Sequence, residues 1–178
     1  ISASIERKPD AATAPQGQIV VTVDWAALSN HLLSGGAPTD QVAYELAALL
    51  RRSYPSIGLT QPLAALPTHL IGHSRGGSVM RETAHLLVKS GIWVDHLTTL
   101  DPHPLTYPDL FIFPAGFVVP DPPVRLHDNV VFADNYWRQD IVADDWFVGN
   151  FDFDGQTVPG SHDVMLLESI LNGLGHGV

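Results

Sequence analysis

The chain has no cysteine and few basic residues. Without cysteine, its 178 residues cannot form disulfides, thiolate metal sites or a cysteine nucleophile. Nine lysines and arginines stand against nineteen aspartates and glutamates, so the formal net charge is -10, and positive charge is nowhere clustered. We therefore expect neither nucleic acid nor an anionic membrane surface as a partner. No apolar run is long enough to span a bilayer, so we also expect no transmembrane segment.

A starting methionine and a signal-peptide pattern are absent too. Because the sequence begins at Ile1, we expect a processed or trimmed product whose targeting segment has been removed. Residues 1–17 are polar and without periodicity, which indicates a loose N-terminal lead-in. The whole chain is 45% hydrophobic and has the length of one ordinary domain with a sizeable core.

Apolar segments with strand character alternate with segments of helical periodicity. We expect strands over 18–25, 68–72, 93–100 and 129–133, a weaker strand over 146–153, and helices over 39–53, 74–89 and 163–174. This alternation predicts an α/β fold with a mostly parallel sheet flanked by helices that cover both of its faces. Ligands bind such sheets beyond the carboxyl ends of the strands, where we expect Ser74, Asp101 and Asp134.

A glycine–serine–glycine motif occupies residues 72–76, between a predicted strand and a predicted helix. Its sequence, G-H-S-R-G, matches the G-x-S-x-G pattern that presents a serine nucleophile on a sharp turn. The following helix turns free N–H groups toward an anion formed at Ser74. A serine that merely caps this helix is the alternative interpretation.

A serine nucleophile needs an imidazole base and a carboxylate that orients the imidazole. Of the nine histidines, we favour His162, in a loop directly before the last predicted helix, over His176 near the C-terminus. Asp101 and Asp134 both follow strands and both remain candidates for the acid. No P-loop lysine is present, and the acidic stretch over 144–154 lacks the full calcium-loop pattern, so we expect no metal and no cofactor.

Three segments resemble the core of the pancreatic-type lipase group of α/β-hydrolases. They are the V-D-W sequence over 23–25, the H-L-I-G-H-S sequence over 69–74 and the L-D-P sequence over 100–102. The resemblance implies a secreted lipase or esterase that cleaves hydrophobic acyl esters and needs no cofactor. It also implies that Ser74 is the nucleophile and that Asp101, rather than Asp134, is the acid. The group has leucine where this chain has Arg75.

One part of the resembled site is missing. The Arg75 backbone N–H supplies one donor for the oxyanion, but the His-Gly loop that supplies the second in this group does not occur in residues 1–17. We expect the backbone of Trp25 or Ala26 to replace it, or the N-terminal strands to have been removed or to belong to a second chain. The alternative is a hydrolase-fold module with weak or no catalytic activity that binds a hydrophobic ligand or partner.

The Pro-rich segment over 102–124 is unusually apolar for a surface loop. Because it follows Asp101, we expect it either to form a lid and acyl-chain wall or to fold under and fill the core. Phe111, Phe113 and Phe117, together with Trp137, are the predicted substrate-pocket residues.

Overall fold

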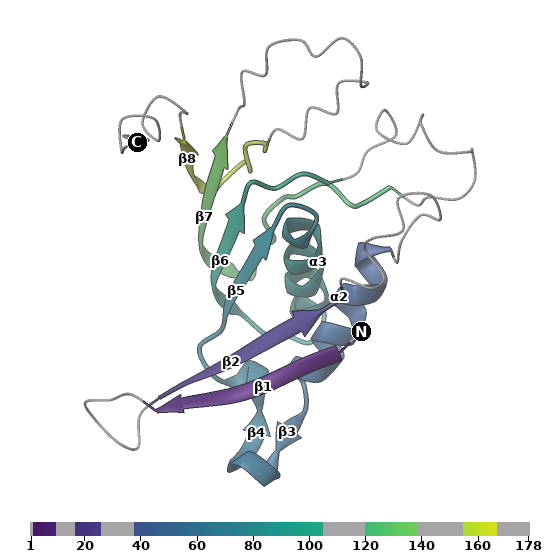
Figure 1. Ribbon diagram of the computed structural model, residues 1–178, viewed down its shortest axis with the longest axis vertical. Coiled ribbons are helices and arrows are strands. Elements are labelled where there is room, and N and C mark those ends of the chain that lie inside the picture. The colour runs from purple at the N-terminus through teal and green to yellow at the C-terminus, as the bar shows by residue number, and fades with distance from the viewer. Residues whose placement is uncertain (1, 10–16, 26–37, 105–119, 139–154, 167–178) are drawn as a thin grey trace, which may run out of the picture.

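The main element is a four-stranded parallel sheet, seen in a computed structural model (Figure 1). The structure describes residues 2–9, 17–25, 38–104, 120–138 and 155–166. The strands, in sheet order, are β5 (His69–His73), β6 (Val94–Leu100), β7 (Val130–Arg138) and β8 (His162–Leu166). This sheet and its helices confirm the α/β class and the parallel pairing expected from the sequence.

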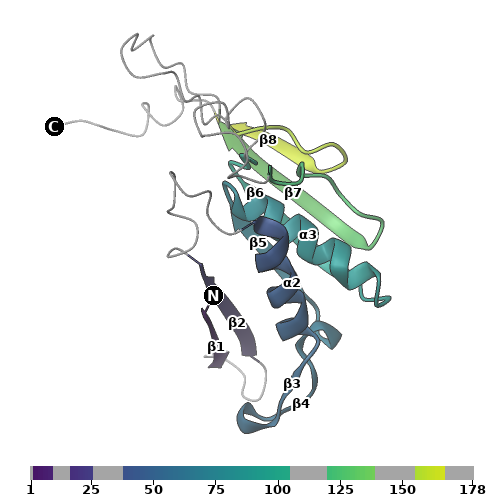
Figure 2. The ribbon, with the colours of Figure 1, turned by 90° about the vertical axis from the view of Figure 1, so that its right-hand side faces the viewer.

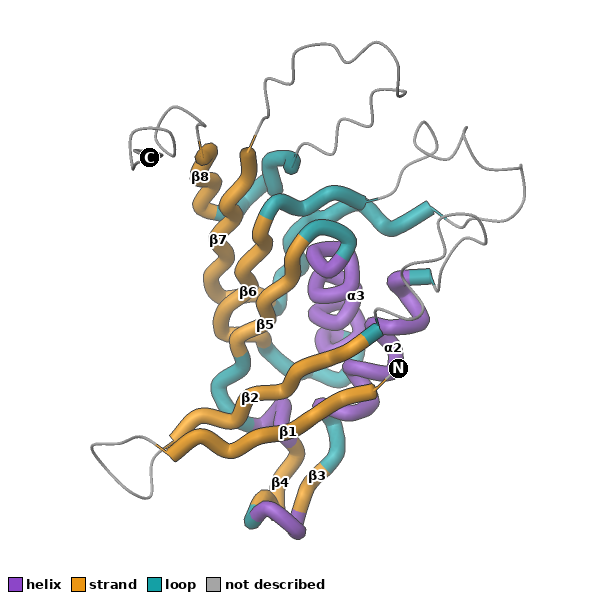
Figure 3. The backbone as a smooth tube through the Cα atoms, in the orientation of Figure 1, coloured by secondary structure: helices purple, strands orange, loops and turns teal. Residues whose placement is uncertain are grey.

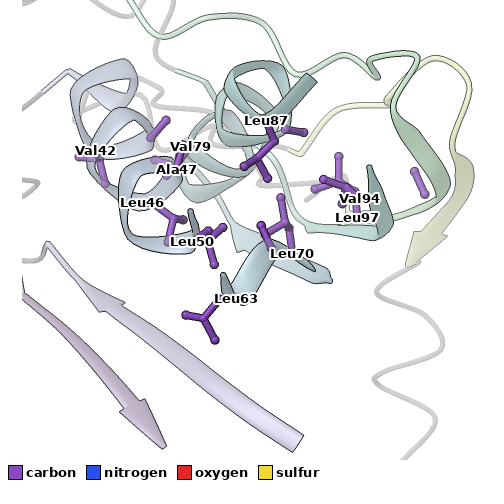
Figure 4. Packing of buried hydrophobic residues seen from close by; sticks show 14 residues of the cluster. Val42, Leu46, Ala47, Leu50, Leu63, Leu70, Val79, Leu87, Val94 and Leu97 are labelled. Atoms are coloured by element: carbon purple, nitrogen blue, oxygen red, sulfur yellow. The ribbon is translucent and has the colours of Figure 1, made fainter. Parts of the chain in front are cut away.

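Two helices build the core on one face of this sheet. Helix α3 (Gly76–Val88) packs against β5 and β6, and α2 (Thr39–Leu50) packs against α3 (Figure 2). Figure 4 shows the buried side chains that join these layers: Val42, Leu46, Leu50, Leu70, Val79, Leu87 and Leu97. Helical spacing in the helices and alternation in the strands place these apolar groups on facing surfaces.

The opposite face of the sheet carries no helix among the described residues. Ile71 and Phe132 on that face are 54% and 50% exposed. Helices were predicted on both faces of the sheet, but the described helices lie on one face only. None of the helices in the described segments has both the length and the apolar character needed to cross a membrane.

The N-terminal residues form a separate hairpin. Strand β1 (Ser2–Pro9) pairs antiparallel with β2 (Gly17–Asp24), apart from the parallel sheet (Figure 3). The expected irregular lead-in is thus partly a strand, because Ile5 packs against the core together with Val21 and Val23 of β2. A shorter hairpin of β3 (Ser53–Tyr54) and β4 (Leu59–Pro62) follows α2.

One predicted boundary and one predicted element type near the C-terminus were wrong. The predicted strand ending at Ala133 continues as β7 to Arg138, and β8 occupies the start of the predicted helix. Over so short a segment, the apolar residues from Val164 onward fit a strand as well as a helix. Residues 167–174 of that helix, and the weaker strand over 146–153, lie outside the described residues.

Candidate active site

Ser74 occupies a sharp turn between β5 and α3. Its backbone φ is 53°, in the left-handed region that a side chain other than glycine's disfavours. The turn is held by hydrogen bonds from the Ser74 N–H to the Leu100 carbonyl (2.9 Å) and from the Gly77 N–H to the Ser74 carbonyl (2.9 Å). Ser74 therefore occupies a strained strand-to-helix turn, at the position predicted from the sequence.

Gly72 allows β5 and α3 to cross closely behind Ser74. A methyl group at Gly72 would overlap the carbonyl oxygen of Gly76 and would lie 2.8 Å from Cγ of Met80. Nothing lies within 4 Å of a methyl group built at Gly76. Of the motif's two glycines, the first is therefore required by backbone packing.

Arg75, the residue after Ser74, forms a buried ion pair with Asp121. Its Nε and Nη2 donate to the two carboxylate oxygens at 2.7 and 2.8 Å. The Thr39 hydroxyl at the start of α2 donates to the same carboxylate at 3.0 Å. The Arg75 guanidinium also lies over the Trp25 ring, 5.4 Å from its centroid. Sequence reasoning missed Asp121 because 46 residues separate it from Arg75.

Asp101 follows β6 directly, one strand away from Ser74. It also adopts a left-handed φ, 48°, and its N–H donates to the Tyr136 carbonyl at 2.6 Å. The Arg138 backbone N–H and Nε donate to the Asp101 carboxylate at 3.1 and 3.0 Å. The predicted position of Asp101 at the carboxyl end of β6 is confirmed. In this structure its carboxylate forms an ion pair with Arg138.

Asp134 does not end a strand, which corrects the prediction. It lies within β7 on the face of the sheet away from α3, where the Thr98 hydroxyl and His96 contact its Oδ1 at 2.5 and 3.1 Å. Burial alone would raise the pKa of Asp134, but hydrogen bonds from Thr98, His96 and Tyr136 outweigh it, so the pKa lies below its ordinary value. Asp134 therefore belongs to a cluster of hydrogen-bonded polar side chains on this face of the sheet.

His162 is not in a loop before a helix but is the exposed first residue of β8. In the sheet it lies in one row with Ile71, Thr98 and Asp134, so three strand spacings separate it from β5. That separation is about 14 Å. Within the described residues, the Ser74 hydroxyl makes no hydrogen bond. The structure brings Ser74 and Asp101 to neighbouring strand ends but does not bring His162 to them.

The remaining predicted residues divide into two groups. Trp137 lies on β7, where its Cβ would be 3.0 Å from a methyl group built at Gly155, and Trp25 contacts Arg75. The other four lie outside the described residues: Ala26, Phe111, Phe113 and Phe117. A groove lined by Val23, Leu46 and Leu49 separates the β1–β2 hairpin from α2 and includes no predicted site residue. Within the described segments, no cluster of three or more metal-ligating side chains occurs.

No protein-family model matches the chain, and neither a curated protein nor a solved structure was found to match it. Function is therefore inferred from the turn at Ser74 and from the side chains around it.

Proposed function

We propose that the protein is an α/β-hydrolase-like serine hydrolase that cleaves carboxylic esters of hydrophobic acyl groups. The observation that carries the proposal is the left-handed Ser74 between a parallel strand and a helix, with β5 and α3 in close contact at Gly72. A serine in this region is strained by about 1–2 kcal/mol. Such strain is characteristic of residues whose side chain must be presented to a ligand.

The proposed chemistry forms and then hydrolyses an acyl-enzyme. Oγ of Ser74 attacks the ester carbonyl carbon as its proton passes to an imidazole. The carbonyl π electrons move onto the oxygen, and the resulting oxyanion accepts a hydrogen bond from the Arg75 backbone N–H. Collapse of this intermediate expels the alcohol, which takes the proton from the imidazolium. Water then repeats the sequence on the acyl-enzyme, releasing the acid and restoring Ser74.

We assign the base to His162 and the orienting acid to Asp101. The segment that leads into β8 lies against this acid: a methyl group at Gly155 would overlap the Asp101 carboxylate, and the Gln156 N–H donates to the Pro102 carbonyl at 3.2 Å. The assignment requires His162 to leave its present position in the sheet and approach Ser74. His103, two residues after Asp101, is the competing base.

Active-site labelling and ester turnover test the proposal. We expect a fluorophosphonate to label the wild type once, at Ser74, and p-nitrophenyl ester turnover to vanish in Ser74→Ala. His162→Gln should lower kcat by about 10³-fold or more, whereas the matched variant His103→Gln should retain it. The reverse pattern would move the base to His103. A folded wild type that is neither labelled nor active would refute the hydrolase.

A silent binding module is the second candidate function. It is favoured by the Ser74 hydroxyl, which forms no hydrogen bond with an imidazole within the described residues. Such a module would bind a hydrophobic ligand or partner without cleaving an ester. Fatty acid binding by a folded wild type that a phosphonate does not label would support this alternative.

A further inference from the structure

We propose that Arg75 and Asp121 are a positioning pair that fixes the oxyanion-binding N–H of Arg75 beside the nucleophile. The inference rests on the proposed function, because it concerns the same reaction centre. It assigns a role to a side chain at which this chain departs from the G-H-S-L-G sequence of the lipase group that it resembles.

The pair is built as a rigid, buried contact. The guanidinium and the carboxylate meet through two parallel hydrogen bonds, at 2.7 and 2.8 Å. Only 15% of the Arg75 side chain and none of the Asp121 side chain is exposed. A bidentate pair of this kind constrains orientation as well as distance. Loss of Asp121 would leave the mostly buried Arg75 guanidinium without this carboxylate.

The pair also joins the nucleophile turn to three other parts of the molecule. Trp25 at the end of β2 lies under the guanidinium, and Thr39 at the start of α2 donates to the Asp121 carboxylate. In the following turn of α3, the Ser78 hydroxyl donates to the Pro122 carbonyl at 2.9 Å, which ties the segment after Asp121 to the same helix. The residue after the nucleophile is therefore held from β2, from α2 and from residues 121–122.

This bracing matters because of what the Arg75 backbone must do. An oxyanion donor has to lie about 2.7–3.1 Å from an oxygen that becomes fully charged only in the transition state. A displacement of about 0.5 Å weakens that contact with little effect on binding of the uncharged ester. The pair should consequently affect kcat and the affinity for tetrahedral analogues, but not KM.

Substitution of the pair, with a stability control, tests the inference. The variants are Asp121→Asn, Arg75→Lys and the double variant Arg75→Leu/Asp121→Leu, which removes both charges and so leaves none unpaired. For each we would measure kcat, KM and the inhibition constant of an alkylboronic acid, which forms a tetrahedral adduct with the serine. Asn129→Ala is the control. Asn129 lies directly before β7, and its buried side-chain amide donates hydrogen bonds to the carbonyls of Ala84 and Ile92.

We expect each pair variant to lower kcat by about 10- to 100-fold, less than loss of a whole oxyanion donor, with KM within about threefold. Boronate affinity should fall in parallel, whereas Asn129→Ala should lower the unfolding midpoint without changing kcat. Wild-type kcat and boronate affinity in the double-leucine variant would show that the pair is only a structural tie and would overturn the inference alone. A folded wild type without turnover or labelling would overturn the inference together with the proposed function.

Discussion

Two residues other than glycine adopt a left-handed backbone within the described segments, Ser74 and Asp101. They follow neighbouring parallel strands, and the Ser74 N–H donates to the carbonyl of Leu100, the residue before Asp101. Each conformation costs roughly 1–2 kcal/mol, which the surrounding hydrogen bonds must offset. Strain is thus concentrated at the two positions that the sequence indicates for a nucleophile and its acid.

Gly72 gives the sharpest stability prediction at this scale. Gly72→Ala should destabilise the fold by about 2–3 kcal/mol, because the methyl group meets the Gly76 backbone, which cannot rotate away as a side chain would. The matched variant Gly76→Ala places its methyl group in open space and should change stability by less than about 1 kcal/mol. Urea unfolding of both proteins measures the difference, and equal losses would contradict it.

His127 provides a pH-dependent prediction. Burial, together with the positive charges of Arg81 and Arg125 and the nearby His85, lowers the His127 pKa from 6.5 to about 4, against the opposing effect of Asp128. Between pH 6.5 and about 4, His127 therefore binds a proton in the unfolded chain but stays neutral in the folded chain. The contribution of neutral, buried His127 to the free energy of unfolding is fully present above pH 6.5. It is lost as the pH falls from 6.5 toward 4.

We expect the wild type to lose about 1 to 3 kcal/mol over that range relative to His127→Leu, which has no proton to bind. Urea unfolding at a series of pH values measures the difference between the two proteins. Parallel pH profiles for the wild type and His127→Leu would contradict the prediction.

At the scale of elements, a buried amide joins three strands of the parallel sheet. Asn135 on β7 accepts a hydrogen bond from the Thr99 hydroxyl of β6 at 2.6 Å and donates to the Asp163 carboxylate of β8 at 2.5 Å. It also donates to the Gln156 carbonyl at 2.9 Å. Asn135 therefore helps to hold β8, and with it His162, in addition to the backbone pairing of β8 with β7.

Asn135→Ala should cost about 2–4 kcal/mol, because it leaves several polar groups unsatisfied around a fully buried position. Gln156→Ala is the matched control, since only the backbone carbonyl of Gln156 takes part and its side chain is exposed. The control should stay within about 0.5 kcal/mol of the wild type. Chemical denaturation measures both values, and a tolerated Asn135→Ala would show that β8 is held by other contacts.

The elements that could be predicted from the sequence are those with a strong local pattern. β5, β6, α2 and α3 alternate or repeat their apolar residues clearly, and the glycines at 72 and 91 mark their ends. The end of β7 was missed because its polar side chains, such as Asp134, lie on a face that none of the described helices covers. The Arg75–Asp121 contact has no local signal, because only the tertiary fold brings its partners together.

At the scale of the whole molecule, the formal charge of -10 opposes compaction. Raising the salt concentration from about 10 mM to about 150 mM shortens the screening length to about 8 Å and should weaken this repulsion. We therefore expect the thermal unfolding midpoint to rise by about 2–5 °C over that range. Scanning calorimetry measures it. A falling midpoint would mean that exposed ion pairs such as Arg138–Asp101 contribute more than the net repulsion costs.

Within the described residues, the position of β5 at the edge of the parallel sheet has a consequence for handling the protein. Among the described residues β5 pairs only with β6, and Ile71 on β5 is 54% exposed. A bare edge with an apolar neighbour can template β-augmentation by another molecule. Refolding from denaturant should accordingly give the best yield at high dilution, and turbidity should grow with protein concentration.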